Sequence, residues 1–194
     1  MYNHPKTRPA TFTIAALIFG AACVSPLWAA KQTHYDLFPR VQEQVLRYSF
    51  FTVFDDVSAE IAQNGHVVLT GHVLGAHKTG DIAKRVKSVD GVTKVTHNIH
   101  VLPASQLDDQ LRYLIARVIY DNPHFWHYLN RNNPTIHIVV KRGHVTLTGV
   151  VDTEIDRTLA GTLATQFDAF SVTNELRLHT EVACLLYTSP SPRD

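Results

Sequence analysis

The sequence predicts an α+β fold of two tandem units, each with the element order α-β-β-α-β, in which two helices cover one face of a three-stranded sheet. The first observation is an internal repeat: NGHVVLTGHV at 64–73 matches RGHVTLTGVV at 142–151, at an offset of 78 residues. VTHNIHV at 95–101 matches VTNELRL at 172–178, at an offset of 77 residues. One residue is therefore extra in the first copy, and we place it in the connection LGAHKTG at 74–80, because surface loops tolerate insertions.

Hydrophobic periodicity is the second observation, and it assigns the elements of each unit. Each copy opens with a helix, continues with two alternating strands and a second helix, and closes with a third strand. The units are expected at 37–102 and 106–180, joined by the linker LPASQ. The apolar positions of the opening helices are Val41, Val45, Leu46 and Tyr48 in the first copy, and Leu111, Ile115, Val118 and Ile119 in the second.

Four glycines recur at equivalent places in the two copies. Gly65 and Gly143 belong to tight turns between the first two strands, where glycine accommodates a positive φ. Gly71 and Gly149 lie inside the second strand, where glycine indicates a close approach of a helix to the sheet.

The N-terminus has the order of a secretory signal peptide, expected at residues 1–30. Basic residues precede an apolar run at 12–24, and the small residues Ala29 and Ala30 follow it. A membrane anchor is the alternative, although the run is short for crossing a bilayer. A lipid anchor at Cys23 is a further alternative, because GAAC loosely resembles a lipoprotein cleavage box. The prediction is export to the periplasm with the signal peptide cleaved.

The last residues, at 184–194, follow the end of the second unit and show no periodicity. CLLYTSPSPRD resembles a translated transposon-type sequencing adapter. We therefore expect this tail not to be native, with a flexible tail as the alternative, and we do not count Cys184 as a thiol of the protein. The other cysteine, Cys23, lies in the predicted signal peptide, so the mature units are expected to fold without disulfides.

Composition and motifs disfavour several classes of function. The formal net charge of +1 gives no indication of nucleic-acid binding. The 12 histidines show neither H-E-x-x-H nor another zinc-ligand spacing. The chain lacks G-x-S-x-G, an obvious Ser-His-acid order and a glycine-rich phosphate loop. We expect no enzymatic activity, cofactor, metal or small-molecule substrate.

Two stretches are candidate contacts for a lipid surface or a partner. Basic residues gather at 77–94, where the alternative is an ordinary solvated helix face. Aromatic residues gather at 120–134, where the alternative is a loop folded onto the core. The candidate contact residues are Lys78, Lys84, Arg85, Lys87 and Lys94 in the first stretch, and Phe125, Trp126, Tyr128 and Arg131 in the second.

The repeated G-x-V-x-L-x-G-x-V motif, followed by an alternating V-T-x-x-L-x-L strand, resembles the BON (bacterial OsmY and nodulation) domain family. The chain is similar to a periplasmic protein with two such domains in tandem. The family usually has Gly-Val before the last strand; the first copy has Gly91-Val92, whereas the second has Ala169-Phe170. A polar residue in the last strand is also usual, and it is Asn174 in the second copy.

The resemblance implies a non-enzymatic envelope module that binds anionic phospholipid and supports envelope integrity or osmotic stress tolerance. The alternative is a periplasmic scaffold that docks other proteins without lipid, because the exposed edges of small sheets are natural pairing sites.

Overall fold

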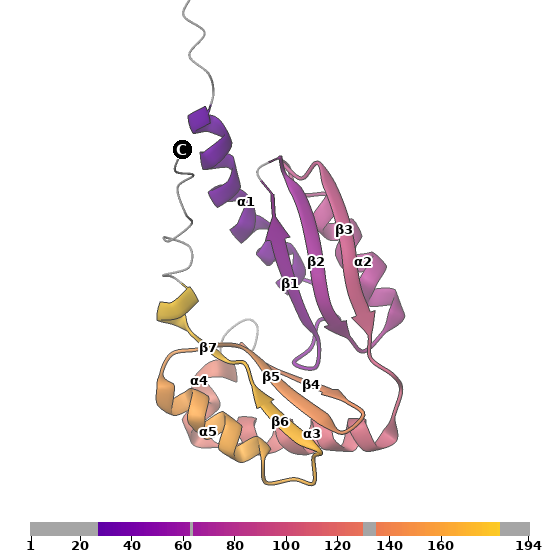
Figure 1. The fold of residues 1–194 in the computed structure, drawn as a ribbon, viewed down its shortest axis with the longest axis vertical. Coiled ribbons are helices and arrows are strands. Elements are labelled where there is room, and N and C mark those ends of the chain that lie inside the picture. Colours follow the sequence, from indigo (N-terminus) through magenta and orange to yellow (C-terminus); the bar gives the residue numbers. More distant parts are fainter. Residues whose placement is uncertain (1–26, 63, 130–134, 183–194) are drawn as a thin grey trace, which may run out of the picture.

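The computed structural model describes residues 27–62, 64–129 and 135–182 of the 194-residue chain, with side chains from Leu37 onward. It confirms an α+β fold of two tandem units (Figure 1). The first unit consists of α1 (Leu27–Leu46), β1 (Asp56–Ile61), β2 (His66–Val73), α2 (Ala76–Lys87) and β3 (Lys94–Val101). The second consists of α3 (Gln106–Tyr120), a 3-10 turn (Pro123–Phe125), α4 (Trp126–Leu129), β4 (Ile136–Lys141), β5 (His144–Val151), α5 (Glu154–Ala164), β6 (Ser171–Asn174) and β7 (Arg177–Leu178).

The two sheets share one topology. β2 lies in the middle of the first sheet, antiparallel to β1 and parallel to β3. β5 takes the same place in the second, between β4 and β6, and β7 also pairs with it. The last strand, predicted as continuous, is divided in the second unit because Asn174 Oδ1 accepts the backbone N–H of Leu176 at 3.2 Å.

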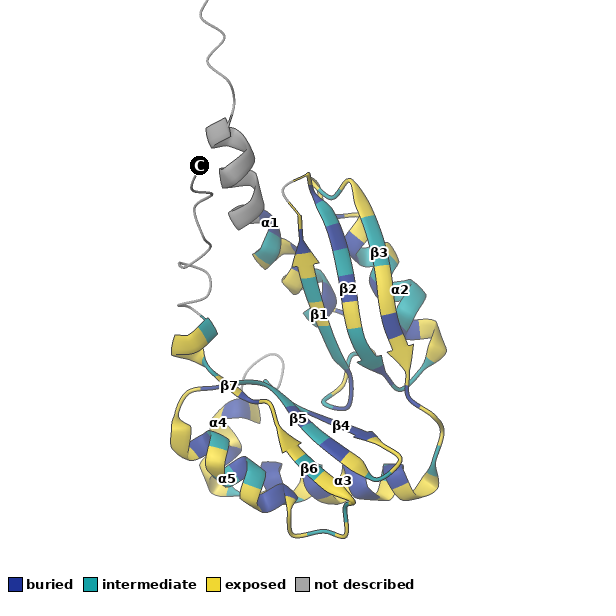
Figure 2. Cartoon of the chain, viewed as in Figure 1, coloured by how far each residue is buried: buried dark blue, intermediate teal, exposed yellow. Residues whose placement is uncertain are grey.

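Each unit has its own hydrophobic core between sheet and helices. The alternation predicted for β2 is confirmed, since Val67, Leu69 and Val73 are fully buried while the residues between them are not (Figure 2). In the second unit Val145, Leu147 and Val151 are buried in the same way. Burial of these alternating side chains is what fixes the register, because a slip of one residue would turn all of them to the open face.

Gly71 and Gly149 allow the close approach of a neighbouring strand, and not of a helix as predicted. Gly71 has φ +127°, and a Cβ there would lie 2.1 Å from the backbone oxygen of Asp56. Gly149 has φ +116°, and its Cβ would lie 1.9 Å from the oxygen of Thr135. The start of the antiparallel neighbour therefore crosses over each glycine. Gly65 and Gly143, both with φ +75°, lie in the hairpin turns as predicted.

The extra residue of the first copy lies after the second helix begins. Both helices start at equivalent points, with N-caps at Gly75 and Thr153. Their buried positions then match at an offset of 78, as in Ile82 and Ala160. The helix α2 has 12 residues and α5 has 11, so the insertion falls at the C-terminal end of α2 and not in the connection at 74–80.

The helix-free face of the second sheet is turned toward the first unit (Figure 1). The contact is made by the loop before β1, residues 51–54, which we name the docking loop. Val53 O accepts the backbone N–H of Ile138 on β4 at 2.7 Å. Phe54 is 8% exposed and belongs to the core of the second unit, where its ring meets that of Tyr113 at 5.2 Å between centroids.

Candidate functional site

Three of the predicted basic contacts are exposed at one end of the first unit. Lys84 and Lys87 lie in the last turn of α2, and Lys94 begins the adjacent strand β3. None of the three forms an ion pair within the part of the chain that the structure describes. Arg85 is half-buried, with its guanidinium carbon 5.1 Å from the centroid of the Tyr48 ring. Of the predicted basic surface, the three lysines are therefore exposed, whereas Arg85 is partly buried by its packing against Tyr48.

Lys78 does not belong to that surface, which corrects the sequence-based set. Its residue is only 6% exposed, and Nζ donates to Asp55 Oδ2 at 2.6 Å. The Asp55 carboxylate is fully buried and also accepts the backbone N–H groups of Thr52 and Leu74. A buried charge needs a partner, so Lys78 is committed to the interior and is inaccessible to a membrane surface.

The predicted aromatic cluster divides between core and surface. Phe125 and Tyr128 are fully buried in the second core, so the structural alternative holds for both. Trp126 is 56% exposed and Leu129, one turn along α4, is 44% exposed. Arg131 lies outside the described residues. Of the aromatic set, only Trp126 is available to a partner or a lipid surface.

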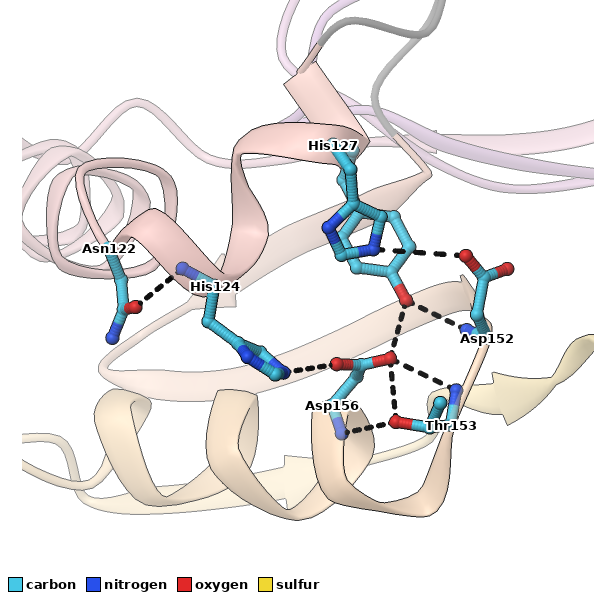
Figure 3. A network of polar contacts seen from close by, with 7 residues as sticks. Asn122, His124, His127, Asp152, Thr153 and Asp156 are labelled. Atoms are coloured by element: carbon cyan, nitrogen blue, oxygen red, sulfur yellow. Dashed lines mark hydrogen bonds and ion pairs between the residues drawn. The ribbon is translucent and has the colours of Figure 1, made fainter.

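A polar network joins this aromatic segment to the start of α5 (Figure 3). Asp156 is 3% exposed; its Oδ1 lies 2.5 Å from Nε2 of His124, and its Oδ2 accepts the Tyr128 hydroxyl at 2.8 Å. Thr153 caps the helix, since its Oγ1 accepts the N–H of Asp156 while Asp156 Oδ2 accepts the N–H of Thr153. The Tyr128 hydroxyl also accepts the N–H of Asp152 at 2.7 Å.

The electrostatics of the network keep Asp156 ionised. Burial raises its pKa, but the hydrogen bonds from Thr153, Tyr128 and His124 together outweigh burial and lower it below 3.8. Burial raises the pKa of the Tyr128 hydroxyl, with Asp156 acting in the same direction. The ionised Asp156, with four donor groups from three residues, and the neutral phenol of Tyr128 form a stable junction. The described residues hold no group of three or more His, Cys, Asp or Glu side chains placed to bind a metal.

The family comparison decides the identity of the units. The model of the BON domain matches the chain twice, at residues 41–103 and 114–179. The chain belongs to the BON domain family. These matches overlap the two units, for which the sequence predicted 37–102 and 106–180.

Two solved structures that are similar to this BON chain are of one protein, CdsD. The C-terminal domain of CdsD, a structural protein of the type III secretion system of Chlamydia trachomatis, is 18% identical with a TM-score of 0.31, over 78% of this chain and 69% of that chain. A second CdsD structure is 13% identical with a TM-score of 0.26, over 80% of this chain and 99% of that chain. No curated protein matches the chain.

The second BON unit has a polar groove of about 470 Å³ along α5 and β6. Several polar groups in the groove are already bonded within the unit: Thr162 Oγ1 donates to Thr158 O, and Asn174 Nδ2 donates to Arg157 O at 2.7 Å. The groove is lined by Glu154, Arg157, Thr158, Gly161, Thr162, Thr165, Val172 and Asn174. Within the described ranges, no helix has the length and apolar character to cross a membrane.

Sequence reasoning missed the buried polar residues that organise both BON units. Asp108 lies in the first turn of α3, and its buried carboxylate accepts the N–H groups of Arg142 and Gly143 at 2.8 Å. Arg112 is 1% exposed and donates to Val140 O. The only available signal was the polar residue at a core-facing helical position, as at Arg112 beside Leu111.

Proposed function

We propose that this chain is a non-enzymatic, envelope-associated binding module whose first unit contacts anionic phospholipid. The observation that carries the proposal is the exposed cluster of Lys84, Lys87 and Lys94 where α2 ends and β3 begins. The nearby acids are partly occupied, because Asp81 accepts the Tyr48 hydroxyl and Asp90 pairs with Arg40. BON membership supports the same proposal, since the family is linked to phospholipid and envelope binding.

The energetics favour weak, salt-dependent binding. Each lysine close to an anionic surface contributes about 1 kcal/mol, and that contribution decays within a Debye length of about 10 Å at 0.1 M salt. Three lysines therefore supply about 3 kcal/mol, roughly a hundredfold in partitioning. Basic residues in the last turn of α2 also complement the helix dipole. This is a second reason for lysines at that position, and a vesicle-binding measurement separates it from lipid binding.

Vesicle co-sedimentation of the purified protein tests the proposal. We expect binding to vesicles that contain phosphatidylglycerol or cardiolipin at low salt, little binding to phosphatidylcholine, and loss of about a hundredfold in the variant with K84Q, K87Q and K94Q. The matched control changes R117Q, R142Q and R177Q, three exposed residues of the second unit, with the same change in net charge. Equal losses in both variants would show a general charge effect, and no binding by the parent protein would refute the lipid function.

A protein scaffold is the second candidate, favoured by the outer face of α3. Leu107 and Leu114, two turns apart on α3, are 78% and 47% exposed, an apolar pair that a protein partner would cover. Capture of envelope proteins by the parent chain but not by an L107Q and L114Q variant, with vesicle binding absent in both, would favour the scaffold.

Export through the predicted signal peptide and a role in osmotic stress tolerance belong to the same proposal. The predicted peptide lies outside the described residues except for 27–30, which begin α1; Cys23 and the predicted non-native tail at 184–194 also lie outside them. Fractionation of cells that express the native gene tests export. Growth of a deletion strain at high osmolarity tests the stress role, with complementation by the parent gene and by the three-lysine variant as the comparison.

A further inference from the structure

The contact between the two units has a histidine at its centre. His137 lies on β4 between Ile136 and Ile138, which are fully buried on the helix-facing side of the sheet. Because side chains alternate along a strand, His137 points to the opposite face, the one turned toward the first unit (Figure 1). There the ring of Phe51, from the docking loop, packs edge-on against the imidazole with 5.6 Å between centroids.

The docking loop and β4 are joined beside this histidine. The N–H of Ile138, the next residue, donates to Val53 O at 2.7 Å. On β4 the following residue of the same face, Val139, is 6% exposed although no helix covers that face. The first unit therefore buries this part of the second sheet, and the Ile138 amide is a direct reporter of the docked state.

Polar atoms on this face lack partners. Nδ1 of His137 and Oγ1 of Thr135 and Thr148 are buried and have no hydrogen-bond partner in the part of the chain that the structure describes. Thr148 is the register partner of His137 on β5, and Thr135 is two residues away on the same side. An imidazolium has two N–H donors where the neutral ring has one. In the docked state a second proton on the His137 ring therefore adds a buried charge, and it leaves Nδ1 as an N–H donor without an acceptor.

Two carboxylates from the first unit face the ring and oppose this effect. Asp55 is already neutralised by Lys78 at 2.6 Å, which leaves Asp56 as the stronger attraction for an imidazolium. The backbone of Thr52 and of Asp55 also favours the charged ring. Burial is nevertheless the largest effect, and it lowers the pKa of His137 below the usual 6.5.

A second histidine titrates beside the same contact. His72, on the open face of β2, is the register partner of His100, with 5.8 Å between ring centroids. Burial lowers the pKa of His72, and Lys141 at the end of β4 and His100 act in the same direction, whereas Asp56 raises it. Lys141 therefore places a positive charge of the second unit close to His72, and protonation of His72 adds a repulsion between the units.

We propose that docking of the two units is pH-sensitive and that protonation of His137 weakens it. When the units separate, the ring regains water and its ordinary affinity for protons. Since the docked pKa is the lower one, docking is strongest above about pH 6.5 and weakens as the pH falls below that value. Between pH 7.5 and 5.5 the docking equilibrium constant falls by at most about tenfold for this one group.

Amide hydrogen exchange followed by NMR on the full chain tests the proposal. Protection factors, which correct for the pH dependence of intrinsic exchange, are measured for Ile138 and for Leu69 in the middle of the first sheet. We expect Ile138 to lose up to about tenfold protection between pH 7.5 and 5.5 while Leu69 keeps its protection. In H137Q this loss of Ile138 protection should largely disappear. The pH dependence of Ile138 protection that remains in the variant measures the contribution of His72.

The matched control is H144Q, which removes an exposed histidine at the start of β5, whose Nδ1 lies 2.8 Å from the Ser171 hydroxyl. It should keep the wild-type pH dependence. Protection of Ile138 that is constant or rises as the pH falls would show that Asp56 outweighs burial and would overturn the proposal, as would an equal loss at Leu69. Should H137Q fail to fold, the ring ¹⁵N titration of the wild type decides: a pKa of His137 at or above 6.5 refutes the mechanism.

Discussion

Lys78 and Asp156 occupy the same position in the first turn of the second helix of each unit, yet they carry opposite charges. Both side chains are buried, at 6% and 3% exposure. Each is bound by the segment that precedes the first strand of its unit. The partner of Lys78 is Asp55, and the partners of Asp156 are His124 and Tyr128. Both units therefore have a buried polar junction at this position, but the helix contributes the positive charge in the first unit and the negative charge in the second.

The two junctions also satisfy the same backbone group. The N–H just before the N-cap belongs to Leu74 in one unit and to Asp152 in the other; it donates to Asp55 Oδ1 and to the Tyr128 hydroxyl respectively. In the first unit the N-cap Gly75 has no side-chain acceptor. A lysine at this end opposes the helix dipole, so Asp55 supplies both the missing acceptor and the negative charge.

Removal of Lys78 should strongly destabilise the first unit. In K78M the buried Asp55 loses its only ion-pair partner among the described residues, and we expect a loss of about 3 kcal/mol, the lower end for a broken buried ion pair because three N–H and O–H donors to Asp55 remain. Urea denaturation measures it. K84M, at an exposed site, should change stability by less than about 0.5 kcal/mol. Additive effects of K78M and D55N in the double variant would argue against the pairing.

Asp156 should make the stability of the second unit depend on pH below about 4. Its pKa is lowered in the folded state, so the stability it contributes is present above its unfolded value near 3.8 and is lost as the pH falls through the folded value. We expect D156N to cost about 2 kcal/mol at pH 7 and less at pH 3. Denaturation at both values tests this, with D168N, at an exposed loop residue, as control. A deficit that stays constant with pH would contradict the prediction.

The repeat and the alternation of β2 and β5 predicted the fold well. A strand with one face in the core places its apolar residues at every second position, so Val67 and Leu69 could be assigned to the interior from the sequence alone. The turns at Gly65 and Gly143 were equally readable, because their positive φ restricts the residue type.

The buried charges could not be predicted in the same way. In the sequence, Lys78 looks like any exposed helical lysine, and its partner lies 23 residues away across two strands. Only the packed structure brings the two together. The role of the docking loop was equally unpredictable, because nothing in its sequence shows that Phe54 belongs to the core of the other unit. Interactions between distant segments leave no local periodicity.

Phe54 should hold the two units together. Truncation in F54A removes a ring from the second core and from its contact with Tyr113, and we expect a loss of about 3 kcal/mol in the unfolding of the second unit. The first unit should then unfold separately, which calorimetry detects as a second transition. F50A is the neighbouring control, because Phe50 is 63% exposed and should cost under about 1 kcal/mol. A single transition with unchanged midpoint in F54A would show that the loop does not couple the units.

Alanine at the two strand glycines should be far more damaging than alanine at a helical glycine. In G71A and G149A the new Cβ would meet a backbone oxygen at 2.1 Å and 1.9 Å, and the positive φ adds strain. We expect each to cost about 3 kcal/mol or more, or to prevent folding. G80A, in α2 with nothing within 4 Å of its Cβ, should instead stabilise by about 0.5–1 kcal/mol through helix propensity. Thermal denaturation of all three decides; tolerance of G71A would mean that β1 does not cross β2 as closely as described.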